Sequence, residues 1–318
     1  MSQSNYPNGF PNGVIIRGVP LQQAQPGEVY WVNNSATAIA KGAVGGSDGN
    51  SGTYTKPFST IQKAIDTCVA GRGDTIMVMP GHAESISSAG ALTIDKNKVA
   101  IVGLGGQGGP SLTLDTANTA SIVVSGSGCT VKGFNILGAF ADIATCFDLQ
   151  GGSYFNMEDL NIVGATTNQN FVDIVTTSTT DYAESGLRVA NCNWKDSDTG
   201  TGTFCAFNGS IDTFDFVDNY INIGVNTSDL PAIAAVASGK LATRINVTGN
   251  SVWRLNDDNP LLITGDGTMN GIVADNFVRH ADTAGEVLVT AGKSIGYFNN
   301  YATAANDASG FLLPAADS

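Results

Sequence analysis

One short pattern decides the fold: Val217-Asp218-Asn219-Tyr220-Ile221 at 217–221, Val247-Thr248-Gly249-Asn250-Ser251-Val252-Trp253 at 247–253, and Val273-Ala274-Asp275-Asn276-Phe277-Val278 at 273–278. Each copy holds an apolar residue, an Asn after a short spacer, and then alternating apolar positions. Alternation with period two is typical of β-strands. The Asn side chain bonds to nearby backbone and tolerates a left-handed conformation, so it can bend the chain between two strands.

The pattern recurs from about residue 99 to the end of the chain. Further copies with Asn lie at 189–194 and 297–301, and copies with substitutions lie at 131–136 and 157–162. We take positions 133, 159, 191, 219, 250, 276 and 300 as equivalent, which gives spacings of 24–32 residues with a mean of about 28. Self-similarity at this period is the signature of a repeat architecture.

The repeat units predict strands, because they are rich in Val, Ile, Thr and Phe and break at Gly, Asn and Asp. Helical repeats would need two amphipathic helices per unit, and propeller blades need roughly forty residues or more. We therefore predict an all-β right-handed parallel β-helix over 73–305, with a C-terminal tail over 306–318 and a ladder of stacked Asn side chains. We expect these neighbours of the Asn positions to pack in the column beneath: Phe134, Leu160, Cys192, Tyr220 and Phe277.

One amphipathic helix is predicted over 59–70, within a loop-and-helix segment at 46–72. Ser59 is the expected N-cap, and Gln62 three residues later completes a capping box. Ile61, Ala64, Ile65 and Cys68 share one face, and Gly71 is a natural stop. A short helix ahead of the first coil can cap the open end of a solenoid, which would otherwise expose core and strand edges.

The first 45 residues read as an arm and a strand that leads into the body. The arm opens with Pro7-Asn8-Gly9-Phe10 and Pro11-Asn12-Gly13-Val14, a tandem of turn-forming residues. Residues 28–32 then read as a strand. We expect residues 1–27 either to dock on a partner surface or to form a strap on their own solenoid. The expected docking residues are Phe10, Val14, Ile15, Ile16 and Arg17.

Composition excludes several classes of function. The net charge is −13 and only 14% of residues are charged, without the clustered Lys and Arg that nucleic-acid backbones or anionic membranes require. The first residues lack the features of a signal peptide, and no apolar run is long enough for a transmembrane helix. The five cysteines are odd in number and show no CxxC spacing, which favours free buried thiols over disulfides or zinc.

Two stretches carry a resemblance to a known family. Residues 47–65, SDGNSGTYTKPFSTIQKAI, and residues 73–82, GDTIMVMPGH, resemble the opening motif of pectin-lyase-like right-handed β-helix proteins. That family implies the β-helix fold over about 47–305 and includes polysaccharide lyases, pectin hydrolases, phage tailspike glycosidases and inert virion parts. The arm segment PNGFPNGVIIRGVPL resembles the start of phage virion structural proteins with this fold.

The chemistry of a β-helix enzyme would need clustered carboxylates. Asp196 and Asp198 lie near Lys195, and Asp257 and Asp258 lie near Arg254. Oxygen ligands in such groups can hold Ca²⁺, but polar turns carry Asp for local hydrogen bonding as well, and we favour the turns.

Two pairs of carboxylates are candidates for glycosidase chemistry, which needs two facing acids. They are Glu158 with Asp159, and Asp215 with Asp218. Residues an odd number apart point to opposite faces of a regular strand, so neither pair is expected to converge. Asp159 stacked on Asn191 in the next coil would supply only one carboxylate.

The remaining candidates favour structural roles. His82 and His280 have no nearby nucleophile arrangement. The segment Gly103-Leu104-Gly105-Gly106-Gln107-Gly108-Gly109 lacks the Lys and the helix of a phosphate loop, so it reads as a loop between coils. Four aromatic residues near the repeat positions would form a sugar-stacking strip if exposed, and we expect them in the core: Trp194, Tyr220, Trp253 and Tyr301.

These observations favour a non-enzymatic phage virion protein that decorates the capsid exterior. We expect it to dock through its arm on the major capsid protein or another shell protein and to form a homotrimer. No catalytic residue, metal or cofactor is predicted. The alternatives are a polysaccharide-degrading enzyme and a passive module that binds a surface glycan.

Overall fold

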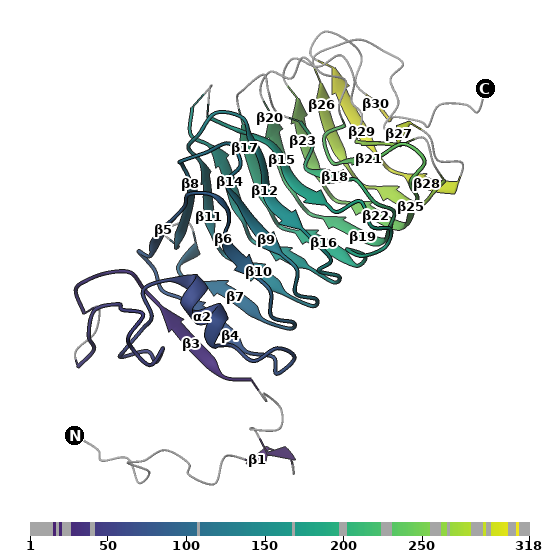
Figure 1. Ribbon diagram of the computed structural model, residues 1–318. Coiled ribbons are helices and arrows are strands. Elements are labelled where there is room, and N and C mark those ends of the chain that lie inside the picture. The colour runs from purple at the N-terminus through teal and green to yellow at the C-terminus, as the bar shows by residue number, and fades with distance from the viewer. Residues whose placement is uncertain are drawn as a thin grey trace.

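The computed structural model describes residues 15–16, 19–20, 27–38, 42–106, 109–166, 169–196, 202–223, 231–254, 262–265, 268–280, 289–290, 294–304 and 310–311. Most of these residues form a parallel β-solenoid with three long sheets (Figure 1). The predicted right-handed parallel β-helix is confirmed as the fold. The described residues include no helix that is long and apolar enough to span a membrane.

Three sheets run along the solenoid. The first sheet holds β3 (Val29–Val32), β4 (Thr75–Val78), β7 (Ala100–Gly103), β10 (Thr130–Lys132), β13 (Asn156–Glu158), β16 (Leu187–Ala190), β19 (Ile211–Val217), β22 (Ala242–Thr248), β25 (Met269–Ala274) and β28 (Ser294–Phe298). The second sheet holds β5 (Ala83–Ile86), β8 (Ser111–Leu114), β11 (Asn135–Gly138), β14 (Asn161–Gly164), β17 (Asn193–Asp196), β20 (Tyr220–Ile223), β23 (Ser251–Arg254), β26 (Phe277–His280), β29 (Tyr301–Ala304) and β30 (Gly310–Phe311). The third sheet holds β6 (Ala89–Ile94), β9 (Ser121–Val124), β12 (Ile143–Leu149), β15 (Phe171–Thr177), β18 (Cys205–Phe207), β21 (Ala234–Val236), β24 (Ile263–Thr264) and β27 (Val289–Thr290).

Each coil visits the third, first and second sheets in turn, so a strand pairs with the strand one coil away. The pairs within the three sheets are parallel, except that β30 runs antiparallel to β29. Inward-facing residues stack in register along the axis. In the first sheet Ile101, Val131, Met157 and Val189 form one such column, and each is at most 3% exposed. Burying each of these side chains contributes on the order of 2 kcal/mol.

A left-handed residue makes the corner between the first and second sheets in coil after coil. Asp159, Asn191, Asp218 and Asp275 occupy this position with φ between 51° and 56°. The equivalent residues elsewhere are Gly133, Gly249 and Asn299. The equivalence of 219, 250, 276 and 300 with 133, 159 and 191 was therefore wrong by one residue, because in later coils the recurring Asn follows the left-handed corner instead of occupying it.

The recurring Asn side chains form the predicted ladder inside the solenoid. Asn219, Asn250, Asn276 and Asn300 are each at most 2% exposed. The Asn250 amide nitrogen donates to the Phe216 carbonyl and to Asn276 Oδ1, both at 2.9 Å. The Asn250 Oδ1 accepts from the backbone N–H and the side-chain amide of Asn219. The ladder thus satisfies the buried polar groups at this corner.

In the earlier coils the ladder position holds Phe134, Leu160 and Cys192, which are buried as predicted. Tyr220 and Phe277 were expected in the same column, and that expectation is wrong. Each follows a buried Asn directly, so strand alternation turns its side chain outward. Tyr220 is 39% exposed and Phe277 is half-buried on the outer face.

The single helix of the described residues, α2 (Ile61–Thr67), packs against β3, β4 and β6 at the start of the solenoid. Ile61, Ala64 and Ile65 are fully buried, so the predicted capping helix and its apolar face are confirmed. The N-cap is Thr60 instead of Ser59: its hydroxyl accepts from the Lys63 backbone N–H at 3.2 Å.

The helix is also shorter than the predicted 59–70, since Cys68 is its C-cap. Gln62 does not close a capping box. Its side-chain oxygen accepts from the Thr93 backbone N–H at 2.8 Å and so ties the helix to β6.

Ahead of the solenoid, β1 (Ile15–Ile16) and β2 (Val19–Pro20) pair antiparallel in a two-stranded sheet of their own. The predicted strand at 28–32 is β3, the first strand of the first sheet. Of the expected docking residues, Ile15 and Ile16 lie in β1, whereas Phe10, Val14 and Arg17 lie outside the described residues.

Candidate functional site

The outer face of the second sheet carries two rows of side chains in strand register. We call them the first row and the second row. The first row is Ser111, Asn135, Asn161, Asn193, Tyr220, Ser251, Phe277 and Tyr301. The second row is Thr113, Leu137, Val163, Lys195, Asn222, Trp253 and Arg279. Successive positions lie about 4.8 Å apart, because they sit on neighbouring strands.

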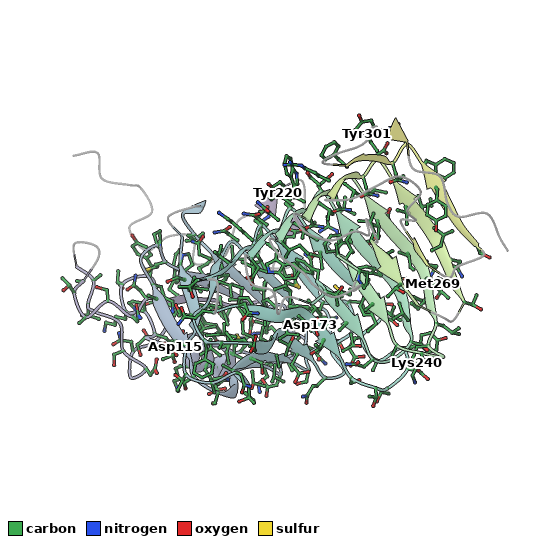
Figure 2. The ribbon with its side chains drawn as sticks, turned by 90° about the horizontal axis from the view of Figure 1, so that it is seen from above. Asp115, Asp173, Tyr220, Lys240, Met269 and Tyr301 are labelled. Atoms are coloured by element: carbon green, nitrogen blue, oxygen red, sulfur yellow. The ribbon has the colours of Figure 1, made fainter. Side chains whose placement is uncertain are left out.

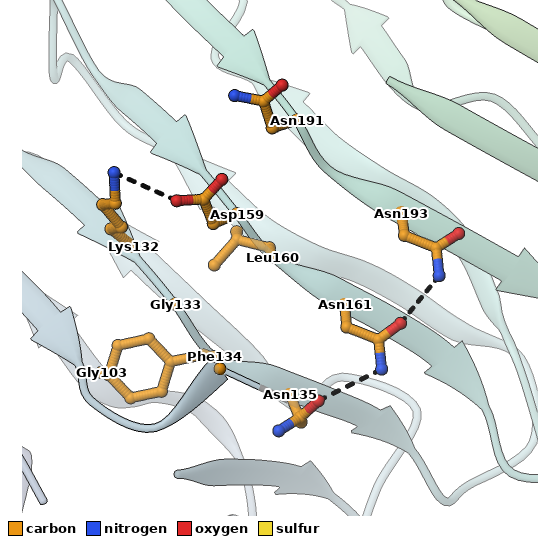
Figure 3. Close-up of a pocket in the computed structure, with 11 residues that line it drawn as sticks. Gly103, Lys132, Gly133, Phe134, Asn135, Asp159, Leu160, Asn161, Asn191 and Asn193 are labelled. Atoms are coloured by element: carbon orange, nitrogen blue, oxygen red, sulfur yellow. Dashed lines mark hydrogen bonds and ion pairs between the residues drawn. The ribbon is translucent and has the colours of Figure 1, made fainter. Parts of the chain in front are cut away.

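A groove with a volume of about 650 Å³ opens where the first row meets the corner of the solenoid (Figure 3). Lys132 and Asp159 line its corner side, and Asn135, Asn161 and Asn193 line the sheet side. At one end the groove is bounded by Gly103 and Gly133, where a side chain would collide with backbone. A Cβ on Gly103 would lie 2.3 Å from the Gly133 carbonyl oxygen.

Three asparagines form a chain of amide hydrogen bonds along the groove. The Asn161 amide nitrogen donates to Asn135 Oδ1 at 3.2 Å, and the Asn193 amide nitrogen donates to Asn161 Oδ1 at 2.9 Å (Figure 3). The chain ends at Asn193 Oδ1, which is buried and has no hydrogen-bond partner among the described residues. An unsatisfied buried acceptor costs about 1–3 kcal/mol, and this oxygen is enclosed by the protein.

On the corner side, Lys132 lies between two carboxylates. Its Nζ is 3.1 Å from Glu158 Oε2 and 3.0 Å from Asp159 Oδ2. Arg188 also bonds to Glu158 and, at 3.2 Å, to Asn156 Oδ1. Glu158 and Asp159 were expected on opposite faces. That expectation is wrong because Asp159 has the left-handed conformation of the corner, which ends the regular alternation of β13.

The electrostatics of this cluster favour fixed charges. Hydrogen bonds to Asp159 and Glu158 raise the pKa of Lys132 above its usual value. Burial raises the pKa of Glu158, but the hydrogen bonds from Lys132, Asn156 and Arg188 outweigh it and leave the pKa below its usual value. Both groups are therefore charged at neutral pH. A general base or acid works best with a pKa near the working pH, so the cluster is suited to binding polar groups.

Beyond the groove the rows become aromatic. The Phe277 and Tyr301 rings stack with centroids 5.7 Å apart, and the Trp253 ring lies 6.2 Å from Phe277. The Arg279 guanidinium carbon lies 5.0 Å from the centre of the Trp253 ring. Tyr220 and Tyr301 follow one edge of the solenoid (Figure 2).

The four aromatic residues that we expected in the core divide between two environments. Trp194 is fully buried, as expected. Tyr220, Trp253 and Tyr301 lie on the outer rows, which is a correction. Strand alternation explains the difference once the outward positions are known. Tyr220, Trp253 and Tyr301 share the parity of the outward positions of their strands, whereas Trp194, next to outward-facing Asn193, has the opposite parity.

Most other candidates have structural roles. Asp196 is 3% exposed, and one of its oxygens accepts from the Phe171 backbone N–H at 3.2 Å. Asp215 accepts from the Asn246 amide, and Asp218 forms a corner. Asp198, the calcium candidate grouped with Asp196, lies outside the described residues, as do Asp257 and Asp258 of the second calcium group. Over the described ranges no three His, Cys, Asp or Glu residues are grouped for a metal.

His82 is buried and holds the start of the solenoid together. Its Nδ1 accepts from the Asn34 backbone N–H at 3.1 Å, and its Nε2 lies 2.9 Å from Glu84 Oε2. The side chain of His280 lies outside the described residues. The Gly-rich segment from Gly103 connects β7 to β8, which belong to the same coil, so the predicted loop lies within a coil and not between two coils.

All five cysteines are free and buried, which confirms the predicted thiols. Burial raises the pKa of Cys68 and of Cys192 to about 12. Such thiols stay protonated at neutral pH and are poor nucleophiles.

The sequence matches no known protein family and no curated protein. Among solved structures, a rhamnogalacturonan lyase is 15% identical with a TM-score of 0.42, over 90% of each chain. The pectate lyase Pel9A is 13% identical with a TM-score of 0.43, over 90% of this chain and 80% of that one. The likeness concerns the β-helix fold, which the strand order of this chain shows independently.

Proposed function

We propose that this protein is a glycan-binding β-helix, and that a linear polysaccharide lies along the outer face of the second sheet. The observation that carries the proposal is the first row, in which amides pass in strand register into aromatic rings: Asn135, Asn161, Asn193, Tyr220, Ser251, Phe277 and Tyr301. This arrangement offers hydrogen bonds at one end and apolar ring surface at the other.

The row supplies what a sugar polymer needs from a protein surface. Sugar rings carry hydroxyl groups at their edges and C–H groups on their faces. The amide side chains of Asn161 and Asn193 line the groove and offer polar surface to hydroxyl groups, and aromatic side chains combine a large apolar surface with low conformational entropy. The spacing of about 4.8 Å between coils is close to the length of one pyranose ring in an extended chain.

The charges in the groove support binding without turnover. Lys132 lines the groove and is held in its ionised form by Asp159 and Glu158. Lys132 can therefore orient hydroxyl or carboxylate groups of a ligand, whereas a lysine that acts as a base at neutral pH would need a pKa lowered toward about 7.

Tyr220→Ala tests the proposal, with Tyr154→Ala and Tyr182→Ala as matched controls. All three tyrosines are exposed, at 39%, 69% and 46% respectively, but only Tyr220 belongs to the first row. We expect Tyr220→Ala to weaken binding to immobilised polysaccharide by about fivefold to tenfold, with both controls unchanged. Equal loss in Tyr154→Ala, or no binding to any polysaccharide in a broad panel, would contradict the proposal.

Turnover is tested on the same panel. We expect no release of reducing ends or unsaturated products when the protein is incubated with a polysaccharide that it binds, with or without calcium. Sustained product release that Lys132→Met abolishes would replace the binding role with an enzymatic one.

A second candidate function concerns a different part of the chain and is compatible with the first. We propose that the protein is a phage virion component on the capsid exterior, docked through its arm to the major capsid protein or another shell protein, as a homotrimer. One observation favours this role: within the part of the chain that the structure describes, β1 and β2 pair with each other and with no strand of the solenoid sheets. A hairpin of this kind can add to a partner's sheet.

The docking role is tested by Ile15→Asp with Ile16→Asp in the full chain. We expect the double variant to keep the far-ultraviolet circular dichroism of the solenoid and to lose binding to shells that lack the protein. Full occupancy of the shells by this variant would exclude docking through β1.

A further inference from the structure

We propose that the glycan on the second sheet is sparsely acidic, with one carboxylate, sulfate or phosphate group every few sugar rings. The inference rests on the proposed glycan-binding function and names the chemical class of its ligand. It comes from the arrangement of cations and acids around the two rows.

Two cations belong to the second row. Lys195 is exposed on β17, and Arg279 on β26 lies over the Trp253 ring at 5.0 Å. Strand register connects them through Asn222 and Trp253. Three strand intervals separate them, which is roughly 14 Å. A chain with one sugar per coil would therefore meet a cation at about every third ring.

Acidic side chains border the first row on its other side. Asp159, Asp218 and Asp275 occupy the left-handed corner in three coils and are exposed. Asp159 is paired with Lys132, which leaves the other two as the acids that matter here. Asp218 lies two residues before Tyr220, and Asp275 lies two residues before Phe277. Together with the net charge of −13, they repel anions that approach the aromatic part of the row.

These two features select between classes of glycan. A neutral chain leaves Lys195 and Arg279 without an anionic partner from the ligand. A chain with an acid on each ring places carboxylates against the corner acids in several coils. A chain with widely spaced acids can pair with the two cations and keep neutral rings beside Asp218 and Asp275.

The test uses three probes: soluble gellan fragments, whose repeat carries a single glucuronate, the same fragments after carboxyl reduction, and polygalacturonate. We expect gellan to bind most tightly and added salt to weaken its binding. We expect carboxyl reduction, Lys195→Gln and Arg279→Gln each to weaken binding by about threefold to fivefold. Arg279→Lys should restore part of the loss of affinity seen with Arg279→Gln.

Lys240→Gln is the control, because Lys240 pairs with Asp181 and lies away from Tyr220 (Figure 2).

The possible outcomes separate this inference from the function on which it rests. If reduced gellan binds as tightly as gellan, and Tyr220→Ala still weakens both, the glycan function stands and acid recognition is overturned. Tighter binding of polygalacturonate would overturn the sparse spacing. If neither these probes nor any other polysaccharide binds, the proposed function fails and this inference fails with it.

Discussion

At the scale of single residues, the Asn ladder shows how one side chain connects neighbouring coils. The Asn250 side chain makes four hydrogen bonds, two to Asn219 and one each to Phe216 and Asn276. Asn300, at the end of the ladder, accepts two from Asn276 and donates one to Val273. Substitution of an Asn in the middle of the ladder therefore breaks more hydrogen bonds than substitution of Asn300.

We predict that Asn250→Ala lowers the free energy of unfolding by about 2–4 kcal/mol, because it leaves buried groups on both sides without partners. Asn300→Ala should cost less. Denaturant unfolding followed by circular dichroism measures both. A larger loss for Asn300→Ala would show that the ladder does not work as a chain.

Asp173 gives a prediction for pH. Burial raises its pKa to about 6, and the Thr203 backbone N–H that bonds to it only partly offsets the shift. Because the folded state holds this proton more tightly than the unfolded state, stability falls as pH rises from about 4 to about 6, by about 3 kcal/mol. Above that range the loss is complete.

Asp173→Asn keeps the acceptor for Thr203 and removes the charge. We predict that it is more stable than the natural protein by up to about 3 kcal/mol at about pH 7.5 and equally stable at about pH 4. Denaturant unfolding at the two values measures the difference. A constant difference between the two proteins across this range would show that Asp173 does not titrate as proposed.

The positions of single residues were the hardest feature to predict. The repeat and its Asn are visible in the sequence, but Asp218-Asn219 and Gly249-Asn250 do not reveal which member makes the corner. Both Asn and Asp tolerate a left-handed conformation. The corner decides which side chains face outward, so the one-residue error also placed Tyr220 and Phe277 in the core. Glu158 and Asp159 were separated for another reason, because the prediction assumed regular strand alternation through the left-handed Asp159.

At the scale of elements, the sequence predicts that α2 is a helix, but it does not predict which residue is its N-cap. Asp48, from a loop distant in sequence, accepts hydrogen bonds from the Ser59 and Thr60 backbone N–H groups and from the Thr60 hydroxyl. This tertiary contact fixes Thr60 as the N-cap. A capping rule that uses neighbours in the sequence does not include it.

We predict that Thr60→Ala lowers the free energy of unfolding by about 1 kcal/mol. Ser59→Ala should change it by less, since Ser59 keeps its backbone N–H bond to Asp48 and loses only its side-chain interaction with that carboxylate. Thermal unfolding of the two variants measures this. Equal losses would place the cap at both residues.

At the scale of the whole molecule, the solenoid turns a repeated position into a continuous surface. Its fold could be predicted because the repeat, the strand pattern and the capping helix all indicated it. The candidate site could not, because its residues come from separate coils. Lys132 and Glu158 are 26 residues apart and meet only through the register of β10 with β13.

A long surface also predicts how affinity depends on ligand length. From Asn135 to Tyr301 the first row covers six strand intervals, or roughly 29 Å. We predict that affinity for a bound glycan rises with oligosaccharide length and levels off at about six to eight rings. Calorimetric titration with a size series measures this. A plateau at two or three rings would indicate a compact site.

The most direct test of the glycan-binding face is a crystal structure with an oligosaccharide from a polysaccharide that the protein binds. We predict a chain along the solenoid axis on the second sheet, with one end in the groove lined by Asn161 and Asn193 and a ring against Tyr220. An oligosaccharide ordered on the third sheet, with the first row left uncovered, would contradict the account.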